Sequence, residues 1–152
     1  MTNDPKSYMR AALKQAEAAA SLGEVPVGAV VVKNGEIISA AHNLVETNHD
    51  VTVHAEILAI RRAGEKLGSW RLDGCELFVT LEPCPMCIGA ILLSRLDTLY
   101  FGAYDEKFGA VGSNFNLADS GLPRAVKVIS GLMEQECSSL LTEFFEAKRR
   151  RG

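Results

Sequence analysis

Blocks of apolar residues along the chain predict helices and strands in alternation. The first helical block opens on Asp4-Pro5, where the carboxylate can cap a helix whose first position is proline, and it ends at Gly23. Residues 27–32 form a continuous apolar run, which predicts a buried strand. Asn34-Gly35 is a strong hairpin signal, so residues 36–41 are predicted to return as an antiparallel strand.

Helical and strand-like blocks continue to alternate in the rest of the chain. A hairpin followed by this alternation predicts an α/β fold, a three-layer α/β/α sandwich around a mixed, mainly five-stranded sheet. The chain contains no internal repeat, low-complexity tract or linker, so residues 1–152 are predicted to form a single domain. The further predicted elements are helices over 54–67, 84–94 and 134–149, the last with Leu140, Leu141, Phe144 and Phe145 as its apolar positions, and strands over 76–80, 98–101 and within 124–130.

Composition narrows the class of protein. With 47% apolar residues in a chain of 152, a sizeable core can form without disulfides. The net charge of −3 argues against generic polyanion binding, although residues 148–151 place four cations at one end, either as a solvated tail or as a phosphate contact. No apolar run reaches the ~20 residues of a membrane span, and no signal-peptide segment opens the chain, so we expect a cytoplasmic protein without membrane contact.

Two short motifs carry the candidate chemistry: His54-Ala55-Glu56 and Pro83-Cys84-Pro85-Met86-Cys87. One imidazole and two thiols are zinc ligands, and three protein ligands leave the fourth tetrahedral position open for water. Both motifs open predicted helices, whose free N–H groups are expected to lower the pKa of the two thiols. Glu56 is placed to move protons beside the water.

Two other interpretations of the cysteine motif are a structural zinc and a redox pair. A structural zinc usually has a second ligand pair, and the chain has no suitable one. A redox pair does not explain the His-x-Glu motif. The remaining cysteines, Cys75 and Cys137, are expected to be small buried side chains.

The motifs resemble those of zinc-dependent nucleoside and nucleobase deaminases, whose pattern is H-x-E followed by P-C-x-x-C. The resemblance to bacterial tRNA adenosine deaminases extends over residues 24–29, 80–87, 102–107, 109–113 and 141–145. It implies a cytidine deaminase-like fold and a homodimer that binds a tRNA anticodon stem-loop. It also implies hydrolytic deamination of the wobble adenosine to inosine. One Zn²⁺ per subunit would be held by His54, Cys84 and Cys87, with Glu56 as the proton shuttle.

The same resemblance implies four substrate contacts. Asn43 corresponds to an asparagine that hydrogen-bonds the target base, and Asp105 and Lys107 correspond to residues lining the nucleotide groove. Phe145 and the basic residues after it correspond to a region that approaches the anticodon loop. Asn43 and Asp105 can alternatively be plain turn residues, and Phe145 a core residue. The helix over 84–94 is a candidate dimer interface.

Two segments depart from the family pattern. Asp50-Val51-Thr52-Val53 stands where the family commonly has Asp-Pro-Thr-Ala, and residues 122–125 stand where many members have an Asn-His-Arg run. Neither change touches the zinc chemistry, but both bear on the substrate. The alternative functions are therefore a deaminase of a free nucleobase or nucleoside, of guanine or cytosine type, and a non-catalytic zinc-stabilised scaffold, against which Glu56 argues.

Overall fold

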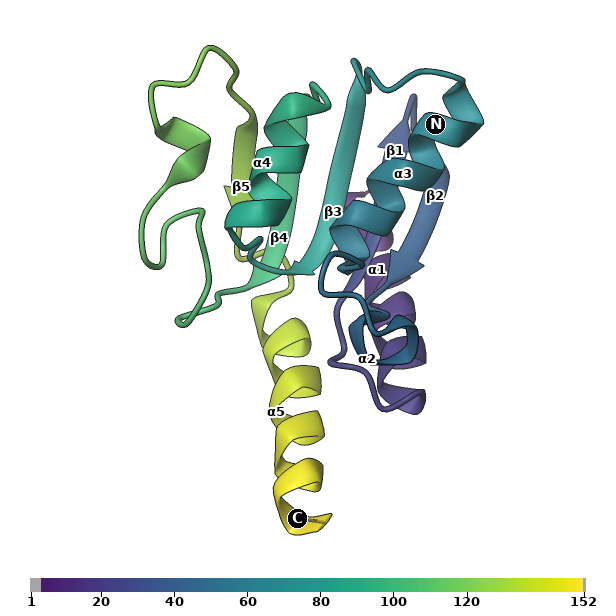
Figure 1. Cartoon of the computed structure of the whole chain (residues 1–152), viewed down its shortest axis with the longest axis vertical. Helices are drawn as coiled ribbons and strands as arrows, with labels where there is room; N and C mark the ends of the chain where they lie inside the picture. Colours follow the sequence, from purple (N-terminus) through teal and green to yellow (C-terminus); the bar gives the residue numbers. More distant parts are fainter. Residues whose placement is uncertain (1–3, 152) are drawn as a thin grey trace.

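A single mixed sheet lies between two layers of helices in the computed structural model, which describes residues 4–151 (Figure 1). The strand order is β2-β1-β3-β4-β5; β1 is antiparallel to both of its neighbours, and β3, β4 and β5 are parallel. This arrangement confirms the predicted fold class. The elements are α1 (Pro5–Ser21), β1 (Gly28–Lys33), β2 (Glu36–His42), α2 (Val45–Asn48), α3 (Ala55–Leu67), β3 (Cys75–Leu81), α4 (Pro85–Leu93), β4 (Thr98–Ala103), the 3₁₀ helix η1 (Leu117–Asp119), β5 (Lys127–Ser130) and α5 (Glu134–Arg151).

Local signals place the boundaries of the first elements as predicted. The Asp4 carboxylate accepts a hydrogen bond of 3.0 Å from the backbone N–H of Lys6 and caps α1. Asn34 and Gly35 both have positive φ, +51° and +77°, as a two-residue turn between β1 and β2 requires. These interactions need no distant partner, which is why the sequence alone predicts them.

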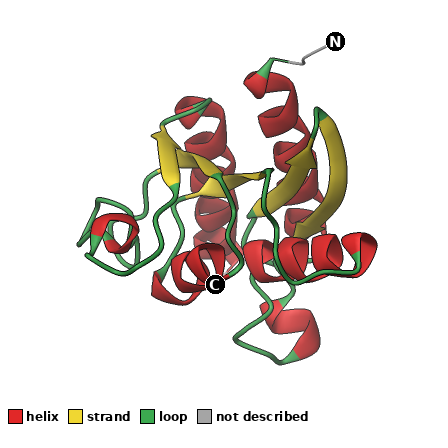
Figure 2. Ribbon diagram, turned by 90° about the horizontal axis from the view of Figure 1, so that it is seen from above, coloured by secondary structure: helices red, strands yellow, loops and turns green. Residues whose placement is uncertain are grey.

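The helices cover the two faces of the sheet in pairs, α3 and α4 on one face and α1 and α5 on the other (Figure 2). Successive residues of β1 alternate between these layers. Ala29 and Val31 face the layer of α3, whereas Val30 and Val32 face the layer of α1. Because both faces are buried, the strand reads as a continuous apolar run.

The structure corrects the predictions at two segments. Helix α2 and η1 were not predicted, because three or four residues are too short to show a helical period. The strand predicted within 124–130 is confirmed as β5, which covers residues 127–130, and residues 124 and 125 before it are exposed. Both unpredicted helices lie in connections between larger elements.

Helix α5 is less buried than its apolar residues predicted. Cys137 is its one buried residue within residues 134–151, and Phe145 is 40% exposed. The helix runs on past the edge of the sheet at which β3 and β4 end, so its outer half has no strand beneath it (Figure 1). Within residues 4–151, no helix combines the length and the apolar character that crossing a bilayer requires.

Candidate metal centre and active-site pocket

The two motifs meet at the edge of the sheet where β3 ends. His54 is the N-cap residue of α3 and Cys84 is the N-cap residue of α4. Both have extended backbone angles, and neither side chain makes a capping hydrogen bond to its own helix. The imidazole of His54 and the thiol of Cys84 are therefore free to turn toward each other. Cys87 lies about one helical turn after Cys84, in α4.

The three predicted ligand side chains form one compact group. His54 Nδ1 lies 3.6 Å from the sulfur of Cys84 and 3.4 Å from the sulfur of Cys87. All three ligand atoms lie within 4.8 Å of one another. Nitrogen and sulfur atoms on one tetrahedral zinc are about 3.6 Å apart, given the usual bond lengths. The donor set and its spacing therefore fit zinc.

The electrostatics of the metal-free group differ between the two thiols. The hydrogen bond from the Cys87 thiol, with those from His54 and the backbone, lowers the pKa of Cys84 to about 4 although burial opposes it. The adjacent Cys84 sulfur and burial raise the pKa of Cys87. The pKa of Cys84 is thus lowered, as the helix N-terminus predicts, whereas that of Cys87 is raised by its neighbour and by burial.

Glu56 lies beside the ligand group without belonging to it. Its side chain is only 4% exposed, in the first turn of α3. Burial raises the pKa of this carboxyl to about 7. A group with that pKa exchanges protons readily near neutral pH, which is what a general acid–base catalyst needs.

A pocket of about 530 Å³ opens next to these residues. Its rim carries apolar side chains that are unusually exposed for their type: Val51 at 72%, Phe108 at 67% and Met86 at 37%. Polar groups stand deeper. The lining comprises Glu24, Val25, Val27, Asn43, Val45, Glu46, Val51, His54, Ala55, Glu56, Leu81, Glu82, Cys84, Pro85, Met86, Asp105 and Phe108.

The structure brings two of the four predicted substrate contacts to this pocket. Asn43 and Asp105 both line it, and both also make the turn interactions that the alternative predicted. The amide of Asn43 accepts a bond of 3.3 Å from the N–H of Val45, and Asp105 accepts bonds from the N–H groups of Lys107 and Phe108. The side chain of Lys107 is exposed and is absent from the lining.

Phe145 likewise lies outside the pocket lining, on the outer half of α5. Its ring packs edge-on against Phe144, with 5.4 Å between the ring centroids. This contact covers part of the ring and leaves the rest exposed. The core alternative for Phe145 is therefore wrong.

Sequence reasoning missed the two buried carboxylates of the pocket, Glu24 and Glu82, and the apolar rim. Glu82 directly precedes the Pro83-Cys84 motif, and Phe108 lies three residues after Asp105. An acidic residue in an apolar context is a usable signal, since buried carboxylates are rare unless they are paired or hydrogen-bonded. The partners of these residues are distant in sequence, so the pattern alone does not identify them.

Comparison with known proteins gives a consistent set of relatives. The MafB19-like deaminase family matches residues 3–149. A tRNA-specific adenosine deaminase of Bacillus subtilis (strain 168) is 49% identical over 152 residues, which cover 99% of this chain and 94% of that protein. Two solved structures are also similar, and both cover most of this chain.

The first structure comes from a study of A-to-I editing by tRNA:A34 deaminases at the wobble position of transfer RNA. It has a TM-score of 0.86 and 45% identity, and the alignment covers 89% of this chain and 99% of that one. The second is a guanine deaminase from Nitrosomonas europaea, with a TM-score of 0.83 and 28% identity over 95% of this chain and 85% of that one. The two folds are about equally similar, so sequence identity separates the two kinds of relative.

Proposed function

This chain belongs to the MafB19-like deaminases and to the tRNA-specific adenosine deaminases among them, and from this membership we propose that it hydrolyses the wobble adenosine of a tRNA anticodon to inosine and ammonia. The observation that carries the proposal is the His54, Cys84 and Cys87 group beside buried Glu56, in a chain 49% identical to a tRNA-specific adenosine deaminase over nearly its whole length. The family match over residues 3–149 supports one deaminase domain for residues 1–152.

In the proposed reaction, His54, Cys84 and Cys87 hold one zinc ion per subunit. Zinc, when bound, acts as a Lewis acid that makes water a nucleophile at neutral pH. Glu56 would accept a proton from the attacking water and give it to the ring nitrogen next to the carbon that carries the amine. It then takes the second proton and gives it to the departing amine, which leaves as ammonia. Burial, which raises the pKa of Glu56 above its ordinary value, supports this role.

The pocket walls suit an extruded purine. A flipped base is bound by stacking on apolar side chains and by hydrogen bonds to its edge. Met86 and Phe108 offer apolar surface at the rim, and the Asn43 amide stands on the wall. We assign Asn43 and Asp105 as base and nucleotide contacts inside the pocket.

The RNA contacts outside the pocket are proposed for Lys107, Phe145 and the basic end of α5. Residues 148–151 are all cationic and exposed, and α5 carries them beyond the edge of the sheet where the pocket lies (Figure 1). Exposed aromatic and cationic side chains of this kind bind single-stranded RNA by stacking and by phosphate contacts. This arrangement supports an anticodon stem-loop as the substrate.

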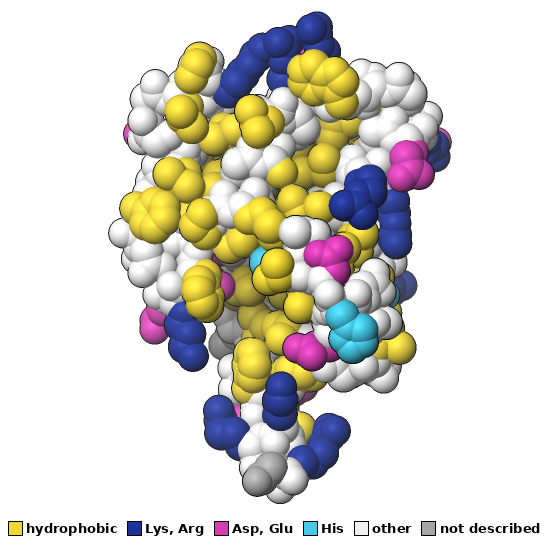
Figure 3. All heavy atoms as spheres, viewed as in Figure 1, with side chains coloured by type: hydrophobic (Ala, Val, Ile, Leu, Met, Phe, Trp, Pro, Cys, Tyr) yellow, Lys and Arg dark blue, Asp and Glu magenta, His cyan; other side chains and the backbone are white. Residues whose placement is uncertain are grey.

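A homodimer is the assembly that the surface supports. Apolar side chains gather over α4 and the segment beside it on the face shown in Figure 3. Leu93 is 75% exposed, Leu122 57% and Phe115 49%. Such a concentration of exposed apolar side chains marks an interaction surface. We propose that a second subunit covers this face, with α4 at its centre.

The test is a deamination assay with a zinc-loaded protein on two kinds of substrate. We expect ammonia release and inosine formation on an anticodon stem-loop with adenosine at the wobble position, and none on a stem-loop with guanosine there. A panel of free bases and nucleosides, guanine and cytosine included, should give at most trace turnover. The similarity to a guanine deaminase makes free guanine the alternative substrate, and turnover of guanine without turnover of RNA would reject the proposal.

The matched control in this assay is Glu56→Ala. It should retain zinc and fold but lose nearly all turnover, by a factor on the order of 10³ or more. Loss of zinc in this variant would show that Glu56 supports the metal instead of moving protons. Binding of zinc and RNA without turnover in the wild type would favour the scaffold alternative.

A further inference from the structure

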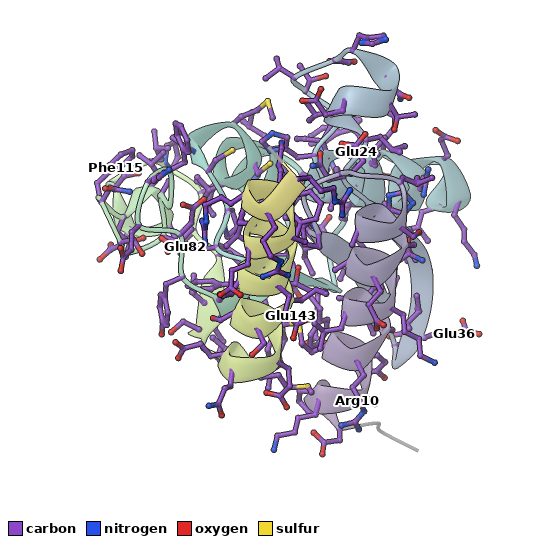
Figure 4. The ribbon with its side chains drawn as sticks, turned by 90° about the horizontal axis from the view of Figure 1, so that it is seen from below. Arg10, Glu24, Glu36, Glu82, Phe115 and Glu143 are labelled. Atoms are coloured by element: carbon purple, nitrogen blue, oxygen red, sulfur yellow. The ribbon has the colours of Figure 1, made fainter. Side chains whose placement is uncertain are left out.

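Two buried carboxylates stand on different sides of the pocket, and neither takes part in the proposed proton transfer. Glu24 is fully buried and Glu82 is 2% exposed, and both line the pocket. Figure 4, which looks onto the edge of the sheet where β3 ends, places Glu24 toward α1 and Glu82 toward the loop that carries Phe115. Within residues 4–151, neither carboxylate forms a salt bridge. Their stabilising partners are therefore hydrogen-bond donors.

Glu24 binds the segment that forms one wall of the pocket, residues 43–51, which we call the α2 wall. Its Oε2 accepts hydrogen bonds of 2.6 Å from both the N–H and the hydroxyl of Thr47. Its Oε1 accepts a bond of 3.1 Å from the N–H of Glu46. Asn43 and Val51, at the two ends of this wall, both line the pocket.

These bonds replace a missing helix cap. The N-cap residue of α2, Leu44, has no side-chain acceptor, and Asn43 accepts a bond only from the N–H of Val45, so the N–H groups of Glu46 and Thr47 take their acceptor from outside the wall. Glu24 supplies the acceptor from the connection between α1 and β1. A four-residue helix has little stability of its own, so its place depends on this carboxylate.

Glu82 binds the opposite wall, residues 104–113, which we call the β4 loop. It accepts bonds from the N–H groups of Asp105 (3.1 Å), Val111 (3.0 Å) and Ser113 (3.1 Å), and also from the hydroxyl of Ser113. The next residue, Pro83, accepts a bond of 2.9 Å from the N–H of Ala110. Residues 82 and 83, which lead into Cys84, are therefore hydrogen-bonded to the β4 loop at several points.

Gly109 shows how closely the β4 loop approaches Glu82. A Cβ atom added at Gly109 would overlap the Glu82 carboxylate and the carbonyl oxygen of Asp105. Asp105 in turn accepts bonds from the N–H groups of Lys107 and Phe108, at 3.0 and 3.1 Å. The position of Phe108 at the rim therefore depends on Asp105, and that of Asp105 depends on Glu82.

We propose that Glu24 and Glu82 are positioning residues, each of which holds one wall of the substrate pocket in place through its hydrogen bonds to backbone N–H groups. The inference rests on the proposed function, because it explains what holds in place the walls of the pocket in which the proposed reaction occurs. Glu24 acts through Asn43 and the α2 wall, and Glu82 acts through Asp105, Phe108 and the β4 loop. Neither carboxylate holds α3, which carries Glu56, so the walls are set separately from the proton shuttle.

The test uses Glu24→Gln and Glu82→Gln in the zinc-loaded full chain. An amide keeps the side-chain volume but turns one acceptor oxygen into a donor, which faces N–H groups and leaves them without a partner. Hydrogen–deuterium exchange should rise in the α2 wall for Glu24→Gln only, and in the β4 loop for Glu82→Gln only. Exchange is measured without substrate, so this result does not depend on which base is deaminated.

Kinetics on the anticodon stem-loop provide the second measurement. We expect KM to rise about tenfold in each variant while kcat changes less than threefold, because the walls hold the base and Glu56 moves the protons. Zinc content should stay at the wild-type level. Unchanged wall exchange, or exchange that rises equally across the whole sheet, would overturn the inference and leave a general stabilising role. An unchanged KM would overturn it as well.

One further variant is a negative control, and two more replace the Gln variants if these do not fold. Glu76→Gln removes a carboxylate from the opposite end of β3, where it accepts a bond of 3.2 Å from the Tyr100 hydroxyl, and should leave both walls and KM unchanged. If a Gln variant fails to fold, Thr47→Val and Ser113→Ala delete one donor to each carboxylate from the wall side. Each should raise exchange in its own wall by a smaller amount, and no change in either wall would reject the proposal.

Discussion

At the scale of single residues, the site depends on groups whose ionisation is set by burial and by one another. Glu56 is nearly inaccessible to solvent, and burial moves its pKa from the ordinary 4.5 to about 7. Hydrogen bonds from Cys87 and His54 lower the pKa of Cys84 to about 4, and the adjacent Cys84 sulfur raises the pKa of Cys87. Burying the Glu56 carboxyl costs folding free energy once it is ionised, because its charged form loses water.

The buried carboxyl of Glu56 should make the metal-free protein less stable as pH rises. Its folded pKa lies above the unfolded value, so the cost begins as pH rises above about 4.5 and is complete above about 7. We expect Glu56→Gln to raise the free energy of unfolding by about 3 kcal/mol at pH 8 and hardly at all at pH 4.5. Urea denaturation with chelator and reductant measures this, and an equal gain at both pH values would contradict it.

Replacing one thiol ligand should abolish zinc retention. Cys87 is fully buried within 3.4 Å of His54 Nδ1, and a hydroxyl at this position is a poor zinc ligand. Elemental analysis after gel filtration should find about one zinc per wild-type chain and less than about a tenth of that in Cys87→Ser. Cys75→Ser, another buried cysteine outside the ligand group, should keep its zinc. Equal zinc in both variants would refute the ligand assignment.

At the scale of elements, helix termini and close contacts decide where the functional groups stand. The N-termini of α3 and α4 supply His54 and Cys84, and a carboxylate from a separate connection caps α2. Helix α5 is held by its first turns, where Cys137 packs against Gly102 of β4. Leu141, one turn further along, also packs against this side of the core, and the outer half of α5 extends past the sheet.

A side chain at position 102 should displace α5. A Cβ there would overlap the sulfur of Cys137 and lie 3.1 Å from the carbonyl oxygen of Leu132. We expect Gly102→Ala to cost about 1–3 kcal/mol of stability, measured by urea denaturation. The double variant Gly102→Ala/Cys137→Ala gives the new methyl group room and should recover part of the loss. No recovery would mean that the cost arises elsewhere in β4.

The basic end of α5 should contribute a salt-dependent part of RNA affinity. Changing Arg149, Arg150 and Arg151 to Gln removes three cations beyond the sheet edge. If each contacts a phosphate, the slope of log affinity against log salt should fall by about 2, measured by fluorescence anisotropy. The matched control changes Lys6, Arg10 and Lys14 of α1 to Gln. These residues lie near Tyr8, whose hydroxyl donates to the carbonyl oxygen of Gly35 in the hairpin at the opposite end of the sheet. Equal slopes in both triple variants would rule out the assignment.

At the scale of the whole molecule, the pocket, the exposed face of α4 and the end of α5 together suit a large substrate. The proposed base site lies in the pocket, whereas α5 carries its cations outside the residues that line it. The exposed apolar side chains around α4 suit a second protein surface. An RNA hairpin bound by two subunits would use all three features.

A charge on the apolar face should break the proposed homodimer. Leu93, at the end of α4, is 75% exposed, and an arginine there would be buried without a partner in the interface. Sedimentation velocity should show a dimer for the wild type and a monomer for Leu93→Arg. Leu22→Arg, which changes an exposed leucine next to α1, should remain a dimer. A monomeric wild type would disprove the dimer itself.

Much of the fold could be predicted because its signals act over short distances in the chain. The Asp4 cap, the Asn34-Gly35 turn and Gly68 at the end of α3 each act within a few residues. The continuous apolar run of β1 predicted a strand buried on both faces, as observed. By contrast, α2 was missed, because its capping carboxylate is Glu24, more than twenty positions earlier in the chain.

The sequence by itself determined the layers of the fold and picked out His54, Cys84, Cys87 and Glu56, which the structure brings together, since ligand chemistry and helix signals are properties of residue type and spacing. Only the tertiary structure decided which predicted contacts reach the pocket: Asn43 and Asp105 do, whereas Lys107 and Phe145 do not. It alone paired Glu24 and Glu82 with their walls and separated the pKa values of Cys84 and Cys87. Burial, hydrogen bonding and charge depend on atoms that folding brings together from distant positions, and no local pattern records them.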